Sequence, residues 1–242
     1  MRLSRIYISQ ELTVGDTVVL PAQAAHYLTR VLRLSAGDAV RLFNGNGKDY
    51  TGEVRKIDRN TVLVGLSGER DPGTESPLKI TLVQAISRGE RMDYTVQKAA
   101  ELGVFSIQPV FTSRVAVRLD DKRRIKRLSH WQGVVTSACE QSGRAVIPQV
   151  LEPLTLADWL MLEDDTQRLV LDPVAENKLS NCKITAGSVS VLVGPEGGFS
   201  THELDQVKAN GVASVSLGPR VFRTESAGPA AMAVLQVIAG DF

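Results

Sequence analysis

The sequence predicts an α/β protein in two parts: a small strand-rich β-barrel with one helix, then a larger domain with a mostly parallel sheet and helices on both faces. A length of 242 residues exceeds that of a common single domain. Short alternating stretches dominate up to residue 66, whereas apolar strands and helical segments alternate after residue 77. Between them, residues 67–77 (SGERDPGTESP) combine Gly, Pro, Ser and charges without apolar periodicity. We therefore expect domains over residues 1–70 and 78–242, joined by a linker at 71–77.

Three strands and one helix are expected in the first domain. The strands cover residues 38–43, 49–57 and 61–66, and the sequence NGNG at residues 44–47 supplies the positive-φ residues of a hairpin turn. The helix covers residues 22–33, after Pro21 near its first position.

Strands and helices should alternate in the second domain, as they do in parallel sheets covered on both faces. The expected strands cover residues 78–85, 105–110, 168–171, 188–193 and 213–217. The expected helices cover residues 90–102, 122–141, 201–210 and 229–239. The third of these begins after a capping-box spacing, Ser200 to Glu203, and the last is delayed because Pro229 is tolerated in a first turn.

Composition narrows the functional class. With 43% hydrophobic residues, 23% charged residues and a net charge of +1, the chain resembles an ordinary globular protein, and nothing in the overall charge demands a nucleic-acid partner. Cys139 and Cys182 are too few for a disulfide framework and lack the spacing of a zinc site, so we expect no metal and a cytoplasmic location. No stretch reaches the ~18 apolar residues that cross a bilayer, so membrane insertion is not expected.

Three expected strands in the second half end in unusual loops, at residues 171–173 (LDP), 194–198 (GPEGG) and 217–225 (LGPRVFRTE). Ligands of open α/β sheets bind at such carboxyl ends, and glycine lets the backbone approach a ligand closely. The loops are therefore candidates for a nucleoside-binding cradle. The alternative is that GPEGG is only a tight turn before a capped helix. Neither the dinucleotide-binding fingerprint nor the phosphate-binding loop is present.

The paired motifs LVGPEGGFS (192–200) and LGPRVFRTE (217–225) resemble the signature of the RsmE family of SPOUT methyltransferases. SRGERM (87–92), QKAAELG (97–103) and CEQSGR (139–144) extend this resemblance over nearly the whole chain. It implies that the first domain is a PUA-like, RNA-binding barrel and the second a SPOUT methyltransferase domain with a C-terminal trefoil knot. The resemblance also implies a homodimer whose active site is completed near the subunit interface.

The family resemblance implies methylation of uridine N3 at position 1498 of 16S ribosomal RNA in the small ribosomal subunit, with S-adenosyl-L-methionine as cofactor. The cofactor-binding residues that it implies follow the three strand ends. They are Leu171, Pro173, Val193, Gly194, Glu196, Gly197, Gly198, Leu217, Gly218, Val221, Phe222 and Thr224.

Arg223 is the first candidate for the chemistry and Arg220 the second. A guanidinium near the methyl group could stabilise negative charge that develops on the uracil ring, or bind a phosphate. Glu225 and Glu196 are candidates to accept the N3 proton or to orient the arginines, and the alternative for both is a role in capping a loop or a helix start.

Expected RNA contacts fall in three groups. Residues 112–130 hold seven Lys or Arg against two Asp, although such a run can also be a solvated helix face. The expected contacts are Arg114, Arg123 and Arg124 in this run, Arg2, Arg5, Arg30 and Arg33 in the barrel, and Arg88, Lys98 and Arg144 in the family-like motifs.

Two other functions stay open at this point. A SPOUT enzyme that methylates ribose oxygens or tRNA would share the same cradle. A non-catalytic RNA-binding or ribosome-assembly protein could keep the fold, although the presence of Gly194, Gly197, Gly198, Arg220 and Arg223 argues against it.

Overall fold

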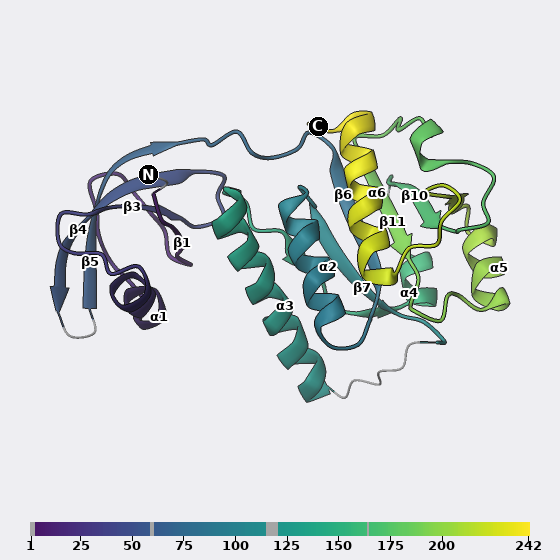
Figure 1. Cartoon of the computed structure of the whole chain (residues 1–242), viewed down its shortest axis with the longest axis horizontal. Coiled ribbons are helices and arrows are strands. Elements are labelled where there is room, and N and C mark those ends of the chain that lie inside the picture. The colour runs from purple at the N-terminus through teal and green to yellow at the C-terminus, as the bar shows by residue number, and fades with distance from the viewer. Residues whose placement is uncertain (1–2, 59–60, 115–120, 164) are drawn as a thin grey trace. The chain divides into compact units, whose positions relative to one another are not determined.

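A computed structural model describes residues 3–58, 61–114, 121–163 and 165–242 (Figure 1). The chain divides into two compact units, Met1–Glu75 with Cys139–Ile147, and Ser76–Ala138 with Pro148–Phe242. The first unit therefore includes a segment from the middle of the chain, which the sequence did not indicate. The linker expected at residues 71–77 stays a prediction.

A mixed five-stranded sheet organises the described part of the first unit, in the order β1-β3-β4-β5-β2. Its strands are β1 (Arg5–Tyr7), β2 (Thr17–Val19), β3 (Ala39–Phe43), β4 (Asp49–Asp58) and β5 (Thr61–Arg70). β1 runs parallel to β3, and the other pairs are antiparallel. The three expected strands are confirmed. β1 and β2 were missed because three residues are too short to show alternation. The described pairings include none between β1 and β2, the pairing that would close the expected barrel.

The helix of the first unit changes type along its length. α1 (Ala22–His26) continues into a π-helical turn, η1 (Tyr27–Val31), and Leu28 is fully buried in the core of the unit. Arg33 then adopts a positive φ of 54°, so the helix expected over residues 22–33 ends earlier than predicted.

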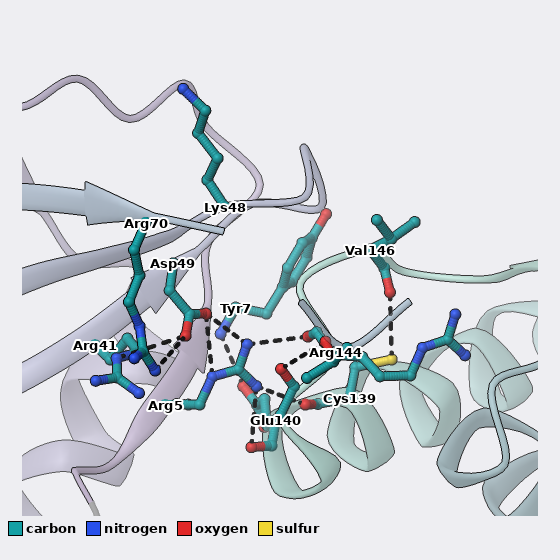
Figure 2. A network of polar contacts seen from close by, with 12 residues as sticks. Arg5, Tyr7, Arg41, Lys48, Asp49, Arg70, Cys139, Glu140, Arg144 and Val146 are labelled. Atoms are coloured by element: carbon teal, nitrogen blue, oxygen red, sulfur yellow. Dashed lines mark hydrogen bonds and ion pairs between the residues drawn. The ribbon is translucent and has the colours of Figure 1, made fainter. Parts of the chain in front are cut away.

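Arg5 connects β1 to β4 and to the segment Cys139–Ile147 inside the first unit (Figure 2). Its Nη2 lies 2.6 Å from Asp49 Oδ1, and both side chains are at most 4% exposed. The same guanidinium donates to the carbonyls of Cys139, at 2.8 Å, and Arg144, at 3.0 Å. The ion pair is thus buried together with its hydrogen-bond acceptors, as a buried charge requires.

Two expected RNA contacts are corrected by this arrangement. Arg5 is committed to Asp49, and the Arg144 side chain is only 6% exposed, with Nη2 2.5 Å from Glu75 Oε2. Neither guanidinium is presented to solvent, so we do not retain Arg5 or Arg144 as RNA-binding residues.

The described part of the second unit contains a parallel seven-stranded sheet, which confirms the predicted class of sheet. Its strand order is β12-β10-β11-β6-β7-β8, with β9 also paired to β7. The strands are β6 (Lys79–Ala85), β7 (Ser106–Phe111), β8 (Gln149–Val150), β9 (Leu154–Thr155), β10 (Gln167–Leu171), β11 (Ser188–Val193) and β12 (Ala213–Val215). β8 and β9 were not predicted, because two residues carry no periodic signal.

Helices cover both faces of this sheet, as expected. They are α2 (Glu90–Glu101), α3 (Asp121–Ser142), α4 (Leu156–Leu160), α5 (Thr201–Ala209) and α6 (Thr224–Ala239), with a 3-10 turn η2 (Leu179–Asn181). Val83 of β6 clusters with Trp159 of α4 and Val207 of α5, whereas its neighbour Leu82 faces Gly228 of α6. Successive strand residues point to opposite faces, so α4 and α5 lie on one face and α6, beside α2, lies on the other (Figure 1). None of the helices described here is long and apolar enough to span a bilayer.

The predicted starts of the last two helices have different outcomes. The capping box of α5 is confirmed, since Ser200 Oγ accepts from Glu203 N–H at 3.2 Å and Glu203 Oε2 accepts from Ser200 N–H at 2.8 Å. The delayed start of the last helix was wrong: α6 begins at Thr224 and contains Pro229. Proline removes one helical hydrogen bond, and the helix continues because its buried face, with Met232 and Leu235, packs in the core.

Candidate active site

A cavity of about 550 Å³ opens at the carboxyl ends of β10, β11 and β12, which are neighbours in the sheet. This volume is within the usual range of small-molecule sites. Of the expected cofactor-binding residues, those that line the cavity are Leu171, Pro173, Val193, Gly194, Glu196, Gly198, Leu217, Gly218, Val221, Phe222 and Thr224. Arg220, Arg223 and Glu225 line it too. Gly197 is not among the lining residues.

The loop at residues 194–198 forms one wall of the cavity. A tight turn closes it, in which Gly198 N–H donates to Pro195 O at 2.9 Å. A Cβ atom at Gly194 would lie 2.9 Å from the Phe199 ring, so a larger residue there would require the ring to move. The second loop, residues 217–225, carries Arg220 and Arg223 and lines the same cavity.

A short buried polar chain connects these two loops. Thr224 Oγ1 donates to Gly194 O at 2.6 Å and accepts from Gln84 Nε2 at 3.1 Å. Gln84 is fully buried in β6. The hydroxyl of Thr224 is therefore committed to joining the loops. Sequence reasoning missed Gln84, although a polar residue near the end of an apolar strand is a usable signal, because a buried polar side chain must find partners in the core.

The charged side chains of the cavity differ in whether they form polar contacts with other residues. Within the described part of the chain, the side chains of Arg220, Arg223 and Glu225 form no hydrogen bond or ion pair. Glu196, in contrast, accepts from Arg91 Nη1 at 2.8 Å. Partial burial acts to raise the pKa of Glu196, but hydrogen bonds from its own backbone N–H, from Arg91 and from the Arg88 N–H outweigh it and lower the pKa.

Arg91 and Asp172 line the cavity although the sequence did not assign them. Asp172 Oδ1 accepts from Val174 N–H at 3.1 Å, which shapes the loop after β10. Arg91 stands in the motif SRGERM, which follows the carboxyl end of β6. Because ligands bind at the carboxyl ends of parallel strands, this position could have indicated Arg91 as a site residue.

The expected RNA contacts lie in both units. Arg30 and Arg33 are exposed in the first unit; in the second, Arg88 and Arg123 are exposed and Arg124 lies 3.7 Å from Glu152. Lys98 pairs with Glu101 at 2.7 Å, and Arg114 donates to Gly197 O at 2.7 Å. Arg2 lies outside the described residues.

Cys139, although part of a family-like motif, is fully buried. Burial raises the pKa of its thiol to about 11, so the thiolate is not accessible near neutral pH. It packs as a small hydrophobic residue, as the sequence indicated.

Comparison with known proteins defines the class first. Residues 74–236 match a family model described as an RNA methyltransferase domain, and residues 20–67 match one described as an RNA methyltransferase PUA domain. The two units and the cavity at the sheet edge are thus those of an RNA methyltransferase with a PUA domain.

Individual relatives narrow this class. Ribosomal RNA small subunit methyltransferase E of Buchnera aphidicola subsp. Schizaphis graminum is 33% identical over 99% of this chain and 98% of its own length. A Neisseria gonorrhoeae structure of the same name, bound to S-adenosyl methionine, has a TM-score of 0.94 at 39% identity. A methyltransferase from Legionella pneumophila with bound SAM has a TM-score of 0.96 at 37% identity, and both structures match over the whole of each chain. The chain belongs to the family of ribosomal RNA small subunit methyltransferase E, which confirms the resemblance seen in its sequence.

Proposed function

We propose that this protein transfers the methyl group of S-adenosyl-L-methionine to N3 of uridine 1498 in 16S ribosomal RNA of the small subunit. The observation that carries the proposal is the cavity itself. Arg220 and Arg223, whose side chains form no hydrogen bond or ion pair within the described residues, line it together with the loops at residues 171–173 and 194–198. Family membership supports the same reaction.

The residues of the cavity fit this cofactor. Apolar side chains such as Leu171, Leu217 and Phe222 suit an adenine ring, and the backbone around Gly194 and Gly218 can serve its hydrogen-bonding edge and the ribose. When bound, the cofactor supplies a methyl group that its sulfonium already makes electrophilic. The protein therefore has to exclude water and to align uridine N3 with that methyl group.

Arg223 and Arg220 serve the uridine in this proposal. Loss of the N3 proton leaves negative charge on the uracil ring, and a guanidinium placed beside the ring stabilises such charge. Glu225 accepts the proton, because it is the cavity glutamate without a partner among the described residues. Glu196 is a weaker base, since its pKa is lowered and its carboxylate is committed to Arg91.

Arg223→Ala tests this assignment. We expect methyl transfer to small ribosomal subunits that lack the modification to be abolished, while calorimetry still detects cofactor binding. The assay follows labelled cofactor and then maps the methyl group on the RNA. Lys208→Ala, an exposed site on α5, is the control and should leave turnover unchanged. Normal turnover by Arg223→Ala would remove Arg223 from the chemistry, and methyl on ribose or on another RNA would change the target.

Further parts of the proposal concern the whole enzyme. We propose RNA contacts at Arg30, Arg33, Arg88, Lys98, Arg114, Arg123 and Arg124. We also propose a C-terminal trefoil knot, supported by the family and by the pairing of β12 with β10. A homodimer fits the 68% exposure of Val237 on α6 and the 79% exposure of Val221, and light scattering would measure the mass. A substrate in the ribosome supports a cytoplasmic location.

A further inference from the structure

We propose that Arg91 and Arg114 are positioning residues of the cofactor pocket, which hold the loop 194–198 in its binding conformation together with Thr224. The inference rests on the proposed use of S-adenosyl-L-methionine. Side chains from α6, from α2 and from the segment after β7 contact this loop at three residues, Gly194, Glu196 and Gly197.

The first point of attachment is Gly194. Its carbonyl accepts from Thr224 Oγ1 at 2.6 Å, and Thr224 is backed by Gln84 at 3.1 Å. Thr224 opens α6 and Gln84 belongs to β6, so the beginning of the loop is tied to the core of the sheet.

The second point is Glu196, at the middle of the loop. Its Oε1 accepts from Arg91 Nη1 at 2.8 Å, and Arg91 lies in the first turn of α2. The two side chains are 45% and 35% exposed, so this pair contributes little to the stability of the whole fold. Its effect is local: it fixes a side chain that itself lines the cavity.

The third point is Gly197, where Arg114 Nη1 donates to the carbonyl at 2.7 Å. Ser113, the residue before Arg114, donates its N–H and its hydroxyl to the Glu203 carboxylate, at 2.6 and 2.8 Å. Glu203 closes the capping box of α5. The chain after β7 therefore braces both ends of residues 197–203, and Arg114 serves the cofactor loop rather than RNA alone.

A loop that binds through its backbone depends on such attachments. Gly194 and Gly198 have no side chain with which to hold themselves in place, and a pocket that must be ordered by its ligand binds more weakly than a preformed one. Misplacement by about 1 Å can reduce a reaction rate by about a hundredfold.

Calorimetry with S-adenosyl-L-methionine on the full chain tests the inference. We expect Arg91→Ala and Arg114→Ala each to raise the Kd by about tenfold, as loss of a preorganising contact does, with an unchanged thermal transition. Arg91→Glu alone should weaken binding. The double variant Arg91→Glu with Glu196→Arg, which restores opposite charges, should recover part of the affinity that Arg91→Glu loses. Thr224→Val should weaken binding more than Thr224→Ser, which keeps the hydroxyl. Lys208→Ala is the control.

The outcomes separate this inference from the proposed function. A wild-type chain that does not bind the cofactor would remove both. A wild-type chain that binds, with Arg91→Ala and Arg114→Ala binding equally well, would overturn only the positioning role. Unchanged cofactor affinity with weakened RNA binding in Arg114→Ala would return this residue to the RNA surface alone. Should Arg91→Ala or Arg114→Ala fail to fold, the charge exchange still decides the role of Arg91. The comparison of Thr224→Val with Thr224→Ser still decides whether the loop is held at Gly194.

Discussion

Gly194, Gly197 and Gly198 of the loop 194–198 are glycines for different structural reasons. Gly194 leaves room for the Phe199 ring, and Gly198 has a φ of 68°, a backbone conformation that side chains disfavour. A Cβ at Gly197 would lie 3.5 Å from Arg114 Cδ, an ordinary contact. The requirement for glycine is therefore strict at two of these positions and mild at the third.

Alanine substitution at Gly198 and at Gly197 should separate the strict requirement for glycine from the mild one. Gly198→Ala should lower the free energy of unfolding by about 1–2 kcal/mol, the cost of a left-handed backbone for an L-residue, and should weaken cofactor binding. Gly197→Ala should change both quantities less. Urea unfolding and calorimetry measure the two effects, and equal losses in both variants would contradict the geometric argument.

Glu203 makes part of the stability depend on pH. Burial acts to raise its pKa, but hydrogen bonds from Ser200 and Ser113 outweigh it, so the pKa lies below the ordinary value of 4.5. A lowered pKa means that the ionised carboxylate stabilises the fold above about pH 4.5 and that this stability is lost as the pH falls through the folded pKa.

Glu203→Gln should therefore be less stable than the wild type near neutral pH, and the difference should shrink on acidification below pH 4.5. Urea unfolding over a series of pH values measures it. A constant difference across the series would show that the charge of Glu203 is not what stabilises the loop.

Among the elements, α3 concentrates the positive charge of the second unit. Arg123 is exposed near its start, and Arg124 lies 3.7 Å from Glu152, an ion pair that solvent weakens. Such a helix face attracts phosphates through counterion release, which is sensitive to salt.

Charge reversal at Arg123 and Arg124 should weaken binding to the small ribosomal subunit. It should also flatten the dependence of affinity on salt, because fewer counterions are released. Filter binding over a salt series would measure both. Reversal at Lys208 of α5 is the matched control, and equal slopes in all variants would assign the α3 charges to solvent.

The longer elements could be predicted from the sequence, since α2 and α3 show a helical period and β6 and β11 are apolar runs of strand length. The short strands β1, β2, β8 and β9 were missed. The predicted last helix was too short, because local reasoning at Pro229 ignores the packing of the whole of α6. Family motifs identified most of the cavity. Gln84, Arg91 and the buried state of Arg5 were missed, because each depends on a contact between residues far apart in the chain.

At the scale of the whole molecule, the Arg5–Asp49 pair should control the stability of the first unit. Arg5→Ala leaves the buried Asp49 carboxylate with the longer ion pairs to Arg41, at 3.5 Å, and Arg70, at 3.8 Å. The substitution should therefore cost at most about 3–5 kcal/mol, the loss expected for a fully broken buried pair. Circular dichroism during urea unfolding should show the transition of this unit moving while that of the second unit stays. Lys48→Ala, which breaks the exposed pair with Glu69, should leave both transitions in place. A small effect of Arg5→Ala would mean that Arg41 and Arg70 compensate the Asp49 charge and that Arg5 does not control the stability of the unit.

The segment Cys139–Ile147 also sets an order of events during synthesis. The ribosome makes the N-terminal strands first, but the carbonyls of Cys139 and Arg144 that receive the Arg5 guanidinium emerge only after β6, α2 and β7. The first unit therefore stays incomplete while residues 76–138 of the second unit are translated. A truncated gene that stops at Glu75 would encode a sheet in which Arg5 keeps Asp49 but lacks the carbonyl acceptors of Cys139 and Arg144.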